Sequence, residues 1–104
     1  MVEIKNNYIL GEKRPMHLPG ASLEIPILTD KDELDINEFA IKNGIDIVSI
    51  ALVRSAENIE KVRDLLRVDP RGEKIKILAK IENMEGLRNY EEILAASDGI
   101  LICR

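Results

Sequence analysis

Aromatic residues are scarce in this sequence of 104 residues, which has one Phe, two Tyr and no Trp. The 45% of residues that are hydrophobic are therefore mostly aliphatic, and this content is too high for a disordered chain. Aliphatic and β-branched residues suit strands that are buried on both faces, as in parallel sheets. The composition therefore favours a parallel α/β domain over an antiparallel sandwich.

Cysteine and excess positive charge are also lacking. Cys103 is the only cysteine, so no disulfide can form within the chain and no cysteine cluster can bind a metal ion. A single free thiol is typical of proteins from a reducing compartment. The net charge of −4 provides no basic surface, so nucleic acid is not expected as a partner.

Long hydrophobic runs are absent as well. The longest apolar stretch, residues 47–53, is interrupted by Ser49 and is far shorter than the roughly 20 residues of a membrane-spanning helix. Residues 1–7 contain no apolar segment of the kind that a secretory signal carries. The sequence therefore predicts a soluble, cytoplasmic chain with no membrane partner.

Residues 1–26 differ in pattern from the rest of the chain. Proline and glycine interrupt this segment repeatedly, and short pieces such as residues 8–10 and 21–25 have the composition of strands. We expect irregular or edge-strand structure here. From residue 28 onward the apolar residues become periodic.

Helices and strands are expected to alternate after that point. Thr29, followed by Asp32, resembles a capping box that opens a helix to about residue 43, and Gly44 is suited to end it. Ser55 is expected to cap a second helix, and the third is predicted as one continuous helix. Strands are predicted at residues 45–53, 74–82 and 100–103, and the third helix is expected to place Leu87, Tyr90, Ile93 and Leu94 on one side. This order implies a parallel sheet, and because the sequence ends within its last strand we expect part of a larger domain.

The strand predicted at residues 74–82 ends in an unusual way. Side chains alternate along a strand, so Lys80 and Glu82 should share one face while Ala79 and Ile81 share the other. In parallel α/β folds, functional side chains collect at the carboxyl ends of strands. A carboxylate there can hold a hard cation and an ammonium group can bind an anion. The pattern indicates a metal-assisted site for an anionic substrate, although a plain ion pair fits these two residues equally well.

Six short sequence strings occur along the chain in an order and at spacings that are typical of one protein family. The string at residues 80–86 (KIENMEG) is highly specific, whereas the LPG string at residues 18–20 alone is weak. Together they resemble the middle of pyruvate kinase over nearly the whole length of the chain. The strings are LGEKR at residues 10–14, HLPG at 17–20, LTDKD at 28–32, VRSA at 53–56, AKIENMEG at 79–86 and AASDGI at 95–100.

The resemblance implies an α/β fold that is a partial TIM (β/α)8 barrel. Residues 1–26 would be the returning, C-terminal end of a β-domain (the B domain) inserted after the third barrel strand. Residues 27–104 would be part of the barrel (the A domain), roughly its fourth to sixth strands, truncated at the sixth. The implied reaction is glycolytic phosphoryl transfer from phosphoenolpyruvate to ADP, giving pyruvate and ATP, with Mg2+ and usually K+, in an enzyme that is commonly a homotetramer.

The resemblance also implies roles for three residues. Lys80 matches the lysine that binds substrate and stabilises the transition state. Glu82 matches one carboxylate ligand of Mg2+, and Arg14 stands where the family often has a lysine near the nucleotide phosphates. The family's second carboxylate ligand is expected two residues beyond Arg104. Ala51 replaces the usual serine, which weakens the expected K+ environment, and Cys103 replaces the usual alanine.

Two other functions remain open from the sequence. A metal-dependent aldolase or lyase on a related phosphoenolpyruvate/pyruvate barrel also holds Mg2+ with carboxylates at strand ends, but the string at residues 80–86 argues against it. A noncatalytic chain, either a degenerate remnant or an interaction module, is the other. By itself, the chain is expected to be inactive.

Overall fold

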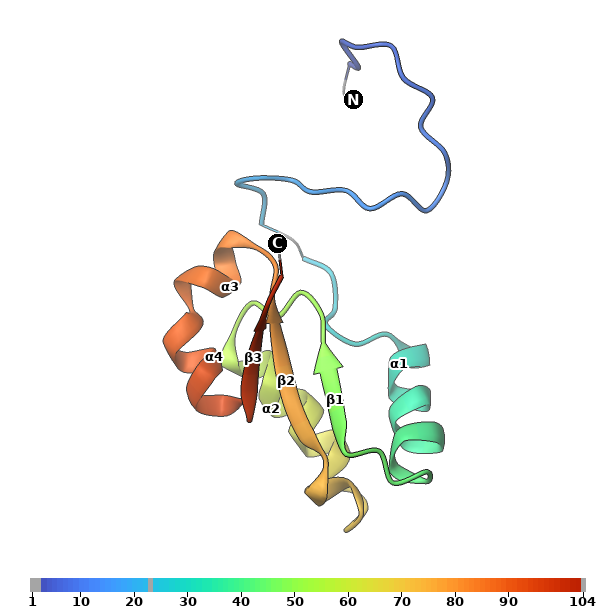
Figure 1. Cartoon of the computed structure of the whole chain (residues 1–104), viewed down its shortest axis with the longest axis vertical. Coiled ribbons are helices and arrows are strands. Elements are labelled where there is room, and N and C mark those ends of the chain that lie inside the picture. The colour runs from blue at the N-terminus through green and yellow to red at the C-terminus, as the bar shows by residue number, and fades with distance from the viewer. Residues whose placement is uncertain (1–2, 23, 104) are drawn as a thin grey trace.

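The computed structural model describes residues 3–22 and 24–103, which contain one parallel sheet (Figure 1). Its strands are β1 (Ile47–Ile50), β2 (Lys76–Ile81) and β3 (Gly99–Ile102), in the order β1-β2-β3. Both neighbouring pairs run parallel, and the sheet is open rather than closed. The predicted α/β fold with three parallel strands is therefore confirmed. Each of the first two strands is shorter than the sequence predicted.

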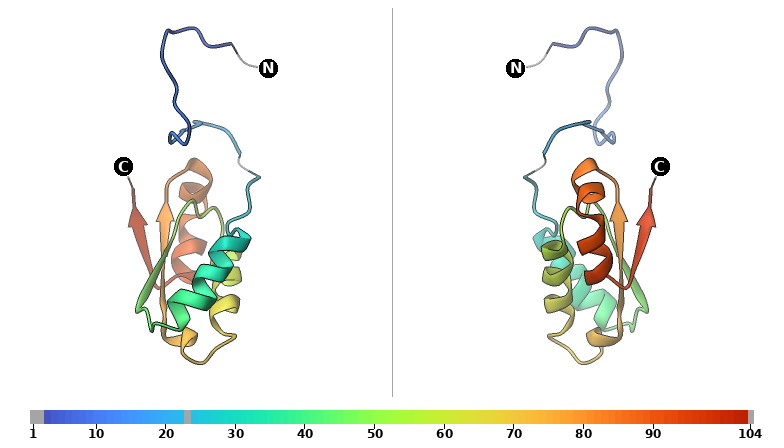
Figure 2. Two further views of the ribbon diagram at one scale, coloured as in Figure 1. Left: turned by 90° about the vertical axis from the view of Figure 1, so that its right-hand side faces the viewer. Right: turned by 90° about the vertical axis from the view of Figure 1, so that its left-hand side faces the viewer.

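Helices lie on one face of this sheet among the described residues, as the two side views show (Figure 2). The opposite face carries no helix of the described chain. No described helix is both long enough and apolar enough to span a membrane. The helical elements are α1 (Asp30–Leu34), the π-helical η1 (Asp35–Ile41), α2 (Ala56–Leu66), the short 3-10 turn η2 (Gly72–Lys74), α3 (Met84–Arg88) and α4 (Tyr90–Ala96).

The start and end of the first helical segment follow the predicted signals. The Thr29 side chain accepts a hydrogen bond from the Asp32 amide, and the Asp32 carboxylate accepts one from the Thr29 amide, which completes the capping box. Gly44 has a φ of +63°, the left-handed conformation that ends a helix and that glycine adopts without strain. These local signals therefore set both boundaries of the segment formed by α1 and η1.

The core lies between the sheet and the helices. In β2, Ile77, Ala79 and Ile81 are buried, whereas the alternate residues are half-buried or exposed. This alternation places Lys80 on the face opposite Ala79 and Ile81, as the sequence predicted, and the described helices leave that face open (Figure 2). The largest side chains that are almost fully buried are Val53, Ile59, Val62, Leu66, Ile77 and Ile93.

The third predicted helix is wrong in two respects. It is broken at Asn89, which has φ −96° and ψ 17°, so that α3 and α4 are separate helices. Of the four residues expected on one side of this helix, Ile93 is fully buried and Tyr90 packs against the core, whereas Leu87 and Leu94 are 56% and 45% exposed. Periodicity did not predict the break, because the backbone conformation of Asn89 is not set by the spacing of the apolar residues.

Residues 8–10 and 21–25, whose composition suits strands, form no strand in the part of the chain that the structure describes. A strand requires a hydrogen-bonded neighbour. The described part of this segment instead crosses beyond the carboxyl ends of β1, β2 and β3 (Figure 1). The irregular alternative given for residues 1–26 therefore applies to the described residues, and Leu23 lies outside them.

A glycine at the start of α3 allows the β1–α2 loop to approach closely. A Cβ atom at Gly86 would lie 2.4 Å from the carbonyl oxygen of Val53, which is backbone and cannot rotate away. We therefore expect Gly86→Ala to lower the free energy of unfolding by about 1–3 kcal/mol, as overpacking does. The midpoint of urea denaturation of the full-length protein measures this. Gly11→Ala is the control, because its Cβ would meet only the flexible Arg14 side chain at 3.6 Å. Equal midpoints for the two variants would contradict the expectation.

Candidate active site

Lys80 and Glu82 form an ion pair at the carboxyl end of β2. The Lys80 Nζ lies 3.1 Å from the Glu82 Oε1, and the two side chains are 27% and 20% exposed. The sequence predicted that both side chains would share one face, and the structure confirms it. A pair that is this little exposed interacts more strongly than one on the open surface, because less water screens it.

The loop that follows β1 completes the surroundings of this pair. The Leu52 amide donates a hydrogen bond to the Glu82 Oε2 at 2.8 Å, and the Val53 amide donates to the Lys80 carbonyl oxygen at 3.3 Å. Leu52 has a φ of +54°, an uncommon conformation for a residue other than glycine. With Leu52 in this left-handed conformation, its amide points at the Glu82 carboxylate.

The pair is ionised at neutral pH. Burial acts to raise the pKa of Glu82, but the Leu52 amide, the Lys80 ammonium group and the Cys103 thiol outweigh it and hold that pKa below its usual range. The hydrogen bond from Lys80 to Glu82, together with the carboxylate charge, raises the pKa of Lys80. The site therefore presents a full positive charge and a full negative charge side by side.

Two asparagines hold the β1–α2 loop in place. The Asn58 Oδ1 accepts hydrogen bonds from the amides of Arg54 and Ser55, at 3.0 and 3.4 Å. The Asn89 Nδ2 donates to the Arg54 carbonyl oxygen at 2.7 Å. The sequence reasoning missed both residues. The position of Asn58, third after the Ser55 cap, was a usable capping signal, whereas nothing in the sequence signals the contact of Asn89 with a residue 35 positions away.

A cleft of about 410 Å³ borders Glu82, and its lining also includes Leu52, Cys103 and residues 16–21. His17 is among the lining residues. Arg14 is exposed and does not line this cleft. The structure therefore brings Lys80 and Glu82 together, and it does not bring Arg14 to them.

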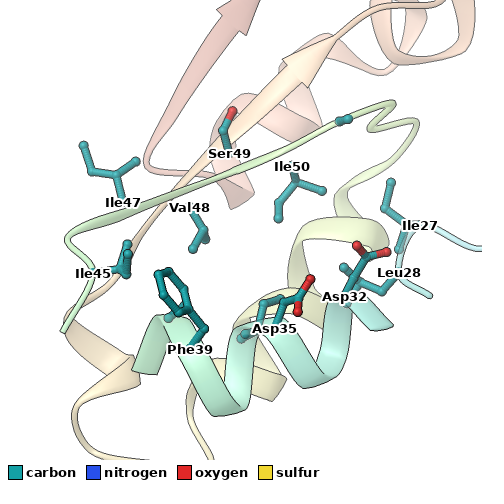
Figure 3. A pocket seen from close by; sticks show the side chains of 13 residues that line it. Ile27, Leu28, Asp32, Asp35, Phe39, Ile45, Ile47, Val48, Ser49 and Ile50 are labelled. Carbon is teal, nitrogen blue, oxygen red and sulfur yellow. The ribbon is translucent and has the colours of Figure 1, made fainter. Parts of the chain in front are cut away.

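A second cleft, of about 430 Å³, separates η1 from β1 (Figure 3). Phe39 points across it toward the strand, where Val48 and Ile50 face the helix (Figure 3). Its lining is mostly aliphatic, and it does not include Lys80 or Glu82. This cleft exposes apolar surface along an edge of the sheet and lacks the paired charges of the Lys80 site.

Metal-binding capacity is limited within residues 3–22 and 24–103. No group of three or more His, Cys, Asp or Glu side chains is close enough there to hold an ion. Glu82 offers one hard, ionised carboxylate. Mg2+ is commonly held by only one or two protein carboxylates, with substrate oxygens and water completing its shell. The donor chemistry of Glu82 therefore fits Mg2+ as one ligand.

Parallel strands joined by helices that lie on one face (Figure 2), with charged side chains at a strand's carboxyl end, fit a segment of a (β/α)8 barrel. Comparison with known families identifies which barrel it is. The family model described as "Pyruvate kinase, barrel domain" matches residues 1–104. This chain belongs to the pyruvate kinase family.

Individual relatives agree along the whole chain. The pyruvate kinase of Dictyostelium discoideum is 40% identical over 101 residues, which are 97% of this chain and 19% of the relative. That of Eimeria tenella is 40% identical over 104 residues, covering 100% of this chain and 19% of the relative. "Pyruvate kinase PKLR" of Homo sapiens is 39% identical over 104 residues, with 100% and 18% covered. The chain thus spans about a fifth of the length of these relatives, and the aldolase alternative is not favoured.

Proposed function

We propose that this chain supplies part of the active site for phosphoryl transfer from phosphoenolpyruvate to ADP, giving pyruvate and ATP. The observation that carries the proposal is the half-buried Lys80–Glu82 pair, 3.1 Å apart, at the carboxyl end of the central strand of a segment from this family. An ammonium group in that position can stabilise negative charge that develops on a transferring phosphoryl group. Such stabilisation is large where water is excluded.

Each residue of the site has a distinct task in this proposal. Lys80 binds the substrate phosphoryl oxygens and neutralises their charge. Glu82 is oriented by the Leu52 amide and is the residue of this chain that would hold Mg2+. When bound, the metal would supply Lewis-acid stabilisation of the substrate oxygens. We also propose a K+ requirement by analogy with the family, although Ala51 offers no hydroxyl group to such an ion.

The domain assignment is part of the same proposal. Residues 1–26 would be the returning end of the inserted B domain, and residues 27–104 would be barrel. The course of the described N-terminal residues, beyond the carboxyl ends of the strands and beside the cleft at Glu82, supports a segment that lies over the site. In this arrangement Arg14 would reach the nucleotide phosphates once ADP is bound. The whole protein is proposed to be a cytoplasmic homotetramer, by analogy with the family.

The metal role of Glu82 has a direct test. Glu82→Gln keeps the size of the side chain but removes the negative charge, so we expect the Mg2+ concentration for half-maximal rate to rise at least tenfold in the full-length protein. A magnesium titration at saturating phosphoenolpyruvate and ADP measures it. Glu57→Gln is the matched control, since Glu57 pairs with Lys61 at the same 3.1 Å on the exposed surface of α2. An unchanged magnesium titration for Glu82→Gln would rule out this role.

A further inference from the structure

Asn89 uses its side chain in an unexpected way. It occupies the N-cap position of α4, where asparagine ordinarily accepts a hydrogen bond from the helix's own first turn. Its side chain makes no capping hydrogen bond. The Nδ2 instead donates to the carbonyl oxygen of Arg54, 35 residues earlier in the chain, at 2.7 Å. This side chain therefore stabilises the β1–α2 loop rather than its own helix.

The backbone of Arg54 is held from both sides, by the side chain of Asn89 and by that of Asn58. Its amide donates to the Asn58 Oδ1 at 3.0 Å, and its carbonyl oxygen accepts from Asn89. Asn58 is buried in α2, and Asn89 is half-buried at the junction of α3 and α4. The backbone of Arg54 is therefore fixed between two helices that pack on the same core.

The β1–α2 loop is strained at Leu52, two residues before Arg54. Leu52 has a φ of +54°, and a residue other than glycine in that conformation costs on the order of 1–3 kcal/mol, so it persists only where its surroundings enforce it. In this conformation the Leu52 amide reaches the Glu82 Oε2 at 2.8 Å. Relaxation of Leu52 to a negative φ would reorient the peptide planes on either side of it, and with them this hydrogen bond.

We propose that Asn89 is a positioning residue for Glu82: by holding the Arg54 carbonyl, it keeps the strained Leu52 amide on the carboxylate that would bind the metal. Asn89 acts through two intermediate residues and touches neither substrate nor metal. The inference rests on the proposed function, because Glu82 is the ligand that it serves. Groups that orient a metal ligand typically change metal affinity or activity by about 10- to 100-fold when removed. An indirect contact such as this one is expected at the lower end of that range.

Asn89→Asp tests the inference in the full-length protein. Aspartate has nearly the same shape and caps helices as well as asparagine does, so α4 is not weakened, but it has no N–H to donate to Arg54. Asn43→Asp is the matched control, because the Asn43 Nδ2 donates to the Phe39 carbonyl oxygen at 2.8 Å, away from the Lys80 site. Asn89→Ala removes the same donor without adding charge.

Three measurements are made on each variant. The rate of amide hydrogen exchange of residues 51–55, followed by mass spectrometry, reports how often the loop opens. The dissociation constant of Mn2+ without substrates, measured by electron paramagnetic resonance, reports how well Glu82 binds metal, independently of turnover. A magnesium titration of ATP formation separates metal affinity from kcat.

For both Asn89 variants we expect loop exchange and the Mn2+ dissociation constant to rise about tenfold, with kcat at saturating metal within about threefold of wild type. Asn43→Asp should match wild type in all three. The inference is overturned if loop exchange and Mn2+ affinity of the Asn89 variants stay within twofold of wild type, or if only the aspartate variant changes. Normal Mn2+ binding by Glu82→Gln would instead refute the metal role of Glu82, which separates a failure of the proposed function from a failure of this inference.

Discussion

Lys80→Met in the full-length protein is expected to reduce kcat by about 10²- to 10³-fold. Removing one group that stabilises developing charge in a water-excluded site costs roughly this much in other enzymes. Methionine is close to lysine in length, so much of the aliphatic bulk of the side chain is kept while the ammonium group is lost. The charge that Lys80 would stabilise is greatest in the transition state, so kcat should fall more than substrate affinity does.

The comparison that isolates this effect is Lys61→Met. Lys61 pairs with Glu57 at 3.1 Å, as Lys80 pairs with Glu82, but its side chain is 60% exposed on α2. An exposed pair contributes little, so this variant should retain the wild-type rate. Mn2+ binding should survive in both variants, since both keep the carboxylates. A Lys80→Met enzyme with kcat within a few-fold of wild type would remove Lys80 from the chemistry.

The 104-residue chain expressed alone is expected to form no ATP and to lack a cooperative thermal transition. In the part of the chain that the structure describes, the sheet is open, so β1 and β3 each have a hydrogen-bonded neighbour on one side only. Ile47 on β1 is 52% exposed and Ile102 on β3 is 75% exposed, so the outer strands present apolar surface as well as unpaired backbone. A domain has a net stability of only about 5–15 kcal/mol, and uncovered sheet edges and faces of this extent would remove that margin.

Circular dichroism during heating, together with size-exclusion chromatography and an assay for ATP, tests this expectation. We expect aggregation or a broad, non-cooperative melt, and no ATP above the enzyme-free rate. A monomer with a sharp transition would show that the three strands and their helices are stable by themselves. Magnesium-dependent turnover by the chain alone would show that the residues needed for catalysis all lie within it.

The features that the sequence predicted correctly are those set by neighbouring residues. Alternation in residues 76–81 was enough to place Lys80 on the face opposite Ala79 and Ile81, because the period of a strand is fixed by backbone geometry. The capping box at Thr29 and the left-handed Gly44 likewise depend on residues a few positions apart. The parallel sheet followed from the order of helices and strands, since short connections cannot join parallel strands.

The features that could not be predicted depend on contacts distant in the sequence. The Leu52 amide meets Glu82 across 30 residues, and Asn89 meets Arg54 across 35, so no local pattern contains either contact. The break at Asn89 was missed for the same reason. The Asn89 side chain donates a hydrogen bond to the Arg54 carbonyl oxygen in another loop and makes no capping hydrogen bond to α4. The composition of residues 8–10 suits a strand, but strand formation also requires a neighbour, which composition does not reveal.

Formation of ATP from phosphoenolpyruvate and ADP by the full-length protein, with and without Mg2+, decides whether this segment serves a pyruvate kinase. We expect ATP to form only when Mg2+ is present, at a rate that Lys80→Met removes and Lys61→Met does not. A folded full-length protein that forms no ATP at any Mg2+ concentration, or whose turnover is indifferent to Lys80, would contradict the proposed function.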